Sequence, residues 1–153
     1  NRRATPEQKA RAVDIVTSGK KDPNAMLGTT MSKLLLTYEA DMDARGQVEE
    51  DLPVQISMVG DTFIVAMPGE PYHVFGRAIK HGCPTGKCII STLSHGMYGY
   101  MPTPDLLGTY IYPGQLCVGS RFEGDTGDRV VKAALDAMQE LLAKERTTGG
   151  ILL

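Results

Sequence analysis

In Val65-Ala66-Met67-Pro68-Gly69-Glu70-Pro71, an apolar strand runs into a Pro-Gly turn that bears a carboxylate. Pro71 suits the first position of a helix, so we expect a strand-to-helix junction. A second apolar segment, 87–93, leads into Gly96-Met97-Tyr98-Gly99-Tyr100-Met101-Pro102-Thr103, a turn rich in Tyr and Gly. We therefore predict that two strand ends bring polar side chains to one edge of a sheet. Open α/β sheets place their functional sites at that edge.

Around this junction the sequence predicts an α/β fold, specifically a mixed-sheet α/β sandwich fragment with flanking helices. Val54, Ile56 and Met58 alternate with polar residues as in a strand, and Gly60-Asp61 marks the turn of a hairpin. The expected strands are 53–58, 62–67 and 87–93, and the expected helices are 6–18, 30–44, 71–80 and 128–144. Residues 1–50 are expected to form a helical lead-in, and residues 51–153 the α/β part.

The totals describe an ordinary globular chain. It has 153 residues, of which 42% are hydrophobic and 22% charged, enough for one domain with a core. The formal net charge of -2 gives no electrostatic reason to expect nucleic acid as a partner. No apolar run approaches the roughly 20 residues of a membrane span, so we do not expect an integral membrane protein. There is neither a G-x-S-x-G elbow nor a complete P-loop.

The three cysteines leave two interpretations open. Cys83 and Cys88 flank a segment with Pro84 and Gly86, so they could close a small disulfide loop at a turn. The alternative is that all three thiols are unlinked. Cys117 fits a buried free thiol, or a bond to another chain.

Glu70 is the first candidate site residue. A carboxylate between Gly69 and Pro71 is an unusual place for a merely solvated charge. The alternative is a Glu in the first turn of a helix, where the macrodipole favours negative charge. His73 follows Glu70 by three positions, and on one helix the two would share a face that can bind a metal.

Tyrosines gather in the second turn region. Tyr98, Tyr100, Tyr110 and Tyr112 are four of the six tyrosines in the chain. Loop tyrosines often line binding surfaces, because each offers an apolar ring and a polar tip. The alternative is that they pack a long loop against itself. We predict that His95 and Tyr98 line the substrate site.

From about residue 51 to 142 the chain resembles the neutral/alkaline ceramidases, a family of zinc-dependent amidases. The resemblance rests on the Gly-Asp turn at 60–61, on Met67-Pro68-Gly69-Glu70-Pro71, on Tyr98-Gly99-Tyr100-Met101-Pro102-Thr103, and on the closing helix after 124–127. It implies that Glu70 and Tyr100 are ligands of Zn²⁺. It also implies that Tyr112, or its rival Tyr110, donates a hydrogen bond to the developing oxyanion.

The resemblance also implies a partner. The two histidine ligands of the family belong to an N-terminal half that this sequence lacks, so we expect that half as a separate chain. The start at Asn1, without an initiator Met, favours a matured subunit over a separate gene product or a fragment. The implied substrate is an N-acyl lipid or another linear amide, and the implied location is secreted or extracytoplasmic.

Two other functions remain open at this point. One is a non-catalytic structural or assembly subunit of a hetero-oligomer, which would use the tyrosine loop as an interface. The other is a hydrolase of the same fold that acts on a non-lipid amide.

Overall fold

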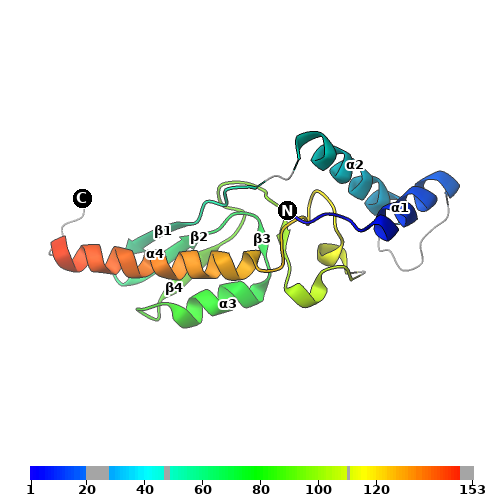
Figure 1. The fold of residues 1–153 in the computed structure, drawn as a ribbon. Coiled ribbons are helices and arrows are strands. Elements are labelled where there is room, and N and C mark those ends of the chain that lie inside the picture. Colours follow the sequence, from blue (N-terminus) through cyan, green and yellow to red (C-terminus); the bar gives the residue numbers. More distant parts are fainter. Residues whose placement is uncertain (20–27, 47–48, 110, 149–153) are drawn as a thin grey trace. The chain divides into compact units, whose positions relative to one another are not determined.

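The computed structural model describes residues 1–19, 28–46, 49–109 and 111–148. The chain forms two compact units, each built from two stretches of sequence. The first unit comprises Asn1–Asp51 and Gly99–Asp125, and the second comprises Leu52–Tyr98 and Thr126–Leu153. The described residues form four α-helices and a small mixed sheet, which confirms the α/β class (Figure 1). None of the described helices has the length and apolarity required to cross a bilayer.

The sheet lies in the second unit and contains three strands in the order β1-β2-β4. β1 (Gln55–Val59) and β2 (Thr62–Ala66) form the predicted antiparallel hairpin. β4 (Cys88–Ser91) runs parallel to β2, with Phe63 opposite Cys88. Because β2 and β4 are parallel, their carboxyl ends lie at the same edge of the sheet, as the sequence predicts.

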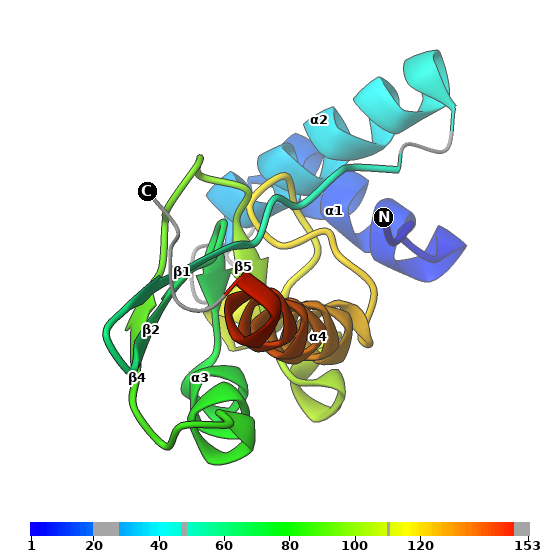
Figure 2. The ribbon, with the colours of Figure 1, turned by 90° about the vertical axis from the view of Figure 1, so that its left-hand side faces the viewer.

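Two helices cover one face of this sheet. α3 (His73–Gly82) and α4 (Thr126–Thr148) lie on the same side of the strands (Figure 2). Phe63 and Val65 point to that face and are completely buried. Strand side chains alternate between faces, so Val59 and Ile89 fall on the opposite face, where both are exposed.

The predicted start of α3 at Pro71 is wrong. Glu70–Pro71 is extended and forms β3, and the helix begins at His73 with Tyr72 as its N-cap. Glu70 therefore precedes the helix, which excludes both its interpretation as a first-turn residue and a helical pairing with His73. The reason is that backbone hydrogen bonds made by Gly69 keep the chain extended past the turn.

The first unit contains α1 (Pro6–Ser18) and α2 (Thr29–Arg45), which pack together. A capping box begins α1, since the Thr5 side chain accepts from the Gln8 amide and the Gln8 side chain accepts from the Thr5 amide. The unit also holds the short strand β5 (Tyr100–Met101) and two single-turn helices, η1 (Pro104–Leu106) and η2 (Tyr112–Gly114).

A polar network ties residues 2–4 into the first unit. The Arg2 guanidinium donates to the carbonyl oxygens of Ser120 and Phe122, each at 2.7 Å. The Arg2 carbonyl in turn accepts from the Tyr38 hydroxyl at 2.6 Å. Because carbonyls of the 120–122 segment accept from this Arg, the segment is held beside α2 through charge-assisted hydrogen bonds.

Glu39 is the buried anion of this network, and only 3% of its surface is exposed. It accepts from the Ala4 amide at 2.6 Å and forms ion pairs with Lys9 at 2.6 Å and Arg3 at 2.9 Å. Burial alone would raise the pKa of Glu39, but Lys9, the Ala4 amide and Arg3 outweigh it. The pKa of this carboxyl therefore lies below its ordinary value.

We predict that Glu39→Gln lowers the free energy of unfolding by about 2 kcal/mol, because it leaves the Ala4 amide and two cations without their buried carboxylate. Asp43→Asn is the matched control. Asp43 also pairs with Arg3 but its side chain is 64% exposed, so its loss should cost less than about 0.5 kcal/mol. Urea unfolding of the two variants and the wild type measures both effects, and equal losses would contradict the assigned role of Glu39.

The same comparison has a predicted pH dependence. A carboxyl whose pKa is lowered in the folded state stabilises the protein above its unfolded pKa, which is about 4.3 for Glu. The stability gap between wild type and Glu39→Gln should therefore be constant near neutral pH. It should shrink as the pH falls below about 4.3 toward the folded pKa. A gap that stays unchanged at pH 3 would contradict this expectation.

Candidate functional site

The turn that bears Glu70 is fixed by backbone hydrogen bonds within the second unit. The Met67 amide donates to the Ser91 carbonyl at 2.8 Å, and the Ser94 amide donates to the Met67 carbonyl at 3.0 Å. The Gly69 amide donates to Gly96 at 3.2 Å and its carbonyl accepts from Leu93 at 2.9 Å. Gly69 has φ +64°, a conformation that side chains other than glycine adopt at a cost. The turn after β2 and the loop after β4 are thus joined into one rigid edge.

The loop after β4 contains backbone strain. Leu93 has φ +57° and His95 has φ +65°, and both lie in the left-handed region. For a bulky residue such as Leu this conformation is a genuine outlier and costs about 1–2 kcal/mol. Strain of this kind gathers at functional sites, where the surrounding structure over-determines the backbone. The loop thus keeps His95 beside the Glu70 turn at a cost in stability.

Glu70 itself is half-buried. Within the described residues, no hydrogen bond or ion pair engages its carboxylate. This contrasts with Glu39, whose charge is fully paired. A carboxylate with a fixed backbone and no partner among the described residues is available to bind a cation.

The first unit brings Tyr100 and Tyr112 together. Their ring centroids lie 5.4 Å apart, and the rings meet edge to face at 79°. Tyr100 is placed by its amide, which donates to the Gly119 carbonyl at 2.8 Å. The chain can approach this closely because residue 99 is a glycine, at which a Cβ would lie 2.5 Å from the Gly119 oxygen.

Tyr112 lies on a loop that a side-chain hydrogen bond fixes in place. It begins η2, and the Pro113 carbonyl after it accepts a hydrogen bond from the buried Ser120 hydroxyl. The Ser120 carbonyl is the acceptor for Arg2 described above. Hydrogen bonds therefore connect Arg2 through Ser120 to Pro113, the residue after Tyr112.

The structure thus brings the predicted site residues into two groups. Tyr100 and Tyr112 lie together in the first unit. Glu70, His95 and Tyr98 belong to the second unit, where His95 is exposed and Tyr98 half-buried. Tyr110 lies outside the described residues. Across the described part of the chain, no three His, Cys, Asp or Glu side chains come together as a metal-binding group.

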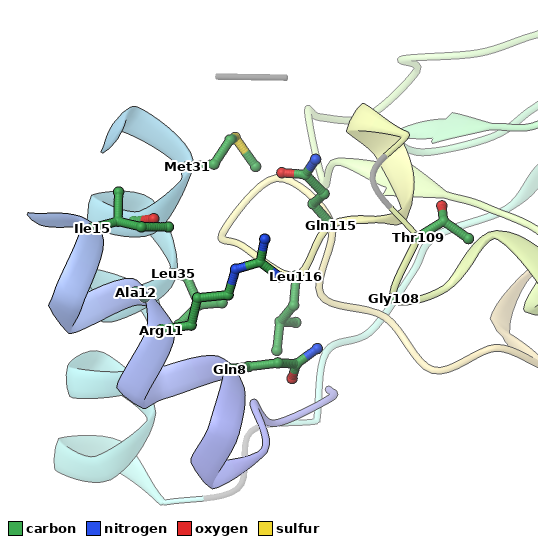
Figure 3. Close-up of a pocket in the computed structure, with 11 residues that line it drawn as sticks. Gln8, Arg11, Ala12, Ile15, Met31, Leu35, Gly108, Thr109, Gln115 and Leu116 are labelled. Atoms are coloured by element: carbon green, nitrogen blue, oxygen red, sulfur yellow. The ribbon is translucent and has the colours of Figure 1, made fainter. Parts of the chain in front are cut away.

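The first unit also contains a cavity that the sequence did not reveal. It has a volume of about 230 Å³ and lies between α1, α2 and the loop that leads to Tyr112. Arg11 and Gln8 of α1 face Gln115 and Leu116 of the loop (Figure 3). Its lining is mixed, because apolar side chains such as Met31 and Leu35 alternate with polar ones such as Arg11 and Gln115. Periodicity places Arg11 on α1 but gives no indication of which loop lies opposite.

Comparison of the chain with protein-family models, with curated proteins and with solved structures found no match.

We predict that Gly99→Ala destabilises the protein by about 3 kcal/mol, because it adds a clash with the Gly119 carbonyl to the strain of a positive φ. The near-ultraviolet circular dichroism of the tyrosines should weaken with it, since Tyr100 loses its anchor. Gly108→Ala is the control in the same unit. Gly108 has φ +78° with no described atom near its missing Cβ, so only the strain of about 1 kcal/mol applies. Equal losses, with unchanged tyrosine signals, would show that the close approach does not position Tyr100.

Proposed function

We propose that this chain is a subunit or fragment of a zinc-dependent amide hydrolase that resembles the neutral ceramidases. The observation that supports it most is the Glu70 carboxylate, which is held on a fixed turn at the carboxyl edge of parallel strands and has no partner among the described residues. The proposal assigns Glu70 and Tyr100 as zinc ligands. A partner chain supplies two histidines to complete the ligand set.

The donor types are compatible with zinc. Zn²⁺ accepts carboxylate oxygens, and catalytic zinc sites combine such a ligand with imidazoles and an open position. The reference pKa of a tyrosine phenol is about 10, and a neighbouring cation favours the ionised form of such a ligand. A zinc ion bound by these residues would supply Lewis acidity toward an amide carbonyl and toward water.

The remaining tyrosines have roles around the amide. The Tyr112 hydroxyl donates a hydrogen bond to the carbonyl oxygen as negative charge develops there, which stabilises the transition state more than the substrate. Its edge-to-face contact with Tyr100 orients the ring. Tyr110 is the rival for this role. His95 and Tyr98 line the substrate, which we propose to be an N-acyl lipid or another linear amide.

The proposal also assigns the open face of the sheet. α3 and α4 cover one face, whereas Val59 is 67% and Ile89 55% exposed on the other. We propose that the partner chain covers this face and completes an α/β sandwich. Exposed apolar residues grouped on one sheet face support such an interface.

The same exposed face favours a second candidate function. A non-catalytic assembly subunit would need this apolar face but would not need a free carboxylate at the strand edge. The two candidates therefore differ in what Glu70 does.

Metal content separates the two candidate functions. The natively purified assembly should contain about one zinc per copy of this chain, as measured by inductively coupled plasma mass spectrometry. Glu70→Ala should lose most of the zinc after dialysis, and Tyr100→Phe should weaken its retention, because each removes an oxygen ligand. Glu140→Ala, an exposed carboxylate on α4, is the control and should retain the metal. A folded assembly without zinc would contradict the proposed hydrolase function and favour the non-catalytic assembly subunit.

Turnover of an amide tests the role of Tyr112. If it stabilises the oxyanion, Tyr112→Phe should lower kcat for an N-acyl amide by about 100-fold, with a smaller change in KM. Tyr72→Phe, at the N-cap of α3, should leave kcat unchanged. Hydrolysis is followed by release of the free amine with zinc content held equal. An equal fall in both variants would assign the effect to packing rather than to the reaction.

A further inference from the structure

The segment from Cys83 to Cys88 places two thiols at the ends of one tight loop. Cys83 is the C-cap of α3, and Cys88 is the first residue of β4. The loop is closed by a hydrogen bond from the Gly86 amide to the Cys83 carbonyl at 3.0 Å. Both ends are held by the second unit, because Cys88 lies opposite Phe63 in the sheet and α3 packs on β4.

The Cys83 sulfur points toward the other end of the loop. Its Sγ donates to the Lys87 carbonyl at 3.4 Å, and Lys87 immediately precedes Cys88. A second contact joins Sγ to the Thr85 hydroxyl at 3.5 Å. Cys83 is 7% exposed, so its thiol lies in the interior beside the start of β4.

The pKa of the Cys88 thiol is raised above its ordinary value. Burial raises the pKa of Cys88 most, and the charge of Cys83 and hydrogen bonding with it raise the pKa further, while Lys80 opposes them. The hydrogen bond that closes the loop and the contact of the Cys83 Sγ with the Lys87 carbonyl place the Cys83 thiol beside the residue that precedes Cys88. Within the described residues no third His, Cys, Asp or Glu joins them, so the pair is not part of a metal-binding group there.

We propose that Cys83 and Cys88 form a reversible disulfide that links the end of α3 to the start of β4. The inference does not depend on the proposed hydrolase function. Cys88 is the thiol that reacts first with an oxidant, because its side chain is half-buried whereas that of Cys83 is buried.

The oxidant is a small-molecule disulfide such as glutathione disulfide. The Cys88 thiolate attacks one of its sulfurs, which forms a mixed disulfide and releases one glutathione thiolate. The Cys83 thiol then loses its proton and attacks the Cys88 sulfur, which releases the second glutathione. Two protein thiols are oxidised to one disulfide, and one glutathione disulfide is reduced to two thiols.

The bond closes a short loop between two packed elements. It restricts the unfolded chain and should raise the melting temperature of the oxidised protein by about 4 °C. Dithiothreitol should return the melting temperature to its reduced value.

Peptide mapping tests the pairing directly. The reduced full-length protein is incubated with glutathione disulfide, free thiols are alkylated, and the protein is digested with trypsin. Cleavage after Lys87 separates the two cysteines, so the disulfide should join peptides 81–87 and 88–121. The Cys117→Ser variant is needed as well, because Cys117 also lies in the second peptide. The linked pair should form in wild type and in Cys117→Ser, and should disappear in Cys88→Ser.

Two results would overturn the proposal. One is recovery of Cys83 and Cys88 as alkylated thiols or as separate glutathione adducts in Cys117→Ser after equilibration. The other is a link in the wild type that is lost in Cys117→Ser, which would assign the bond to Cys117. Since both readings use protein with both loop cysteines intact, failure of Cys88→Ser to fold does not affect them.

Discussion

The Pro68–Glu70 turn depends on backbone hydrogen bonds that join the segments after β2 and β4. Met67 and Gly69 each donate an amide and accept at a carbonyl, and all four partners belong to residues 91–96. Main-chain bonds of this kind do not depend on side-chain identity, so they fix the Glu70 backbone whatever its carboxylate binds. The strained conformations of Leu93 and His95 are tolerated because this pairing over-determines the loop.

In the first unit, charged side chains hold the N-terminal residues in place. Residues 2–4 have no regular structure of their own, yet Arg2 and Glu39 tie them to the 120–122 carbonyls and to α2. The loop with Tyr112 is held from the same segment through Ser120. The polar network therefore holds the loop of Tyr112, and a backbone hydrogen bond to the Gly119 carbonyl places Tyr100. Such networks are sensitive to loss of a single partner.

Local chemistry made several elements predictable. The Thr5–Gln8 capping box and the Gly60-Asp61 turn each fix an element within a few residues. The predicted start of α3 at Pro71 was wrong, because proline fits an extended conformation as well as the first turn of a helix. Hydrogen bonds to a segment more than 20 residues away decided between the two conformations. Neither the positive φ of Leu93 nor the Arg2 network has a local pattern. The grouping of residues 99–125 with the first 51 residues is likewise a long-range property.

The candidate site likewise has features that the local sequence predicts and features that only the tertiary structure reveals. The sequence identifies Glu70 and the tyrosine cluster by residue type, and the structure adds that Glu70 lacks a described partner while Tyr100 contacts Tyr112. The cavity beside Arg11 is formed by two helices and a loop from distant parts of the sequence. No spacing rule relates those segments, so only the tertiary arrangement reveals it.

We propose that the Glu70 carboxylate is a metal ligand. Anomalous scattering at the zinc absorption edge from crystals of the natively purified assembly tests this proposal. We expect one strong peak about 2.0–2.2 Å from a carboxylate oxygen of Glu70, with the Tyr100 oxygen as a further ligand. An assembly in which Glu70 instead pairs with a Lys or Arg of the partner, with no anomalous peak beside it, would contradict the claim.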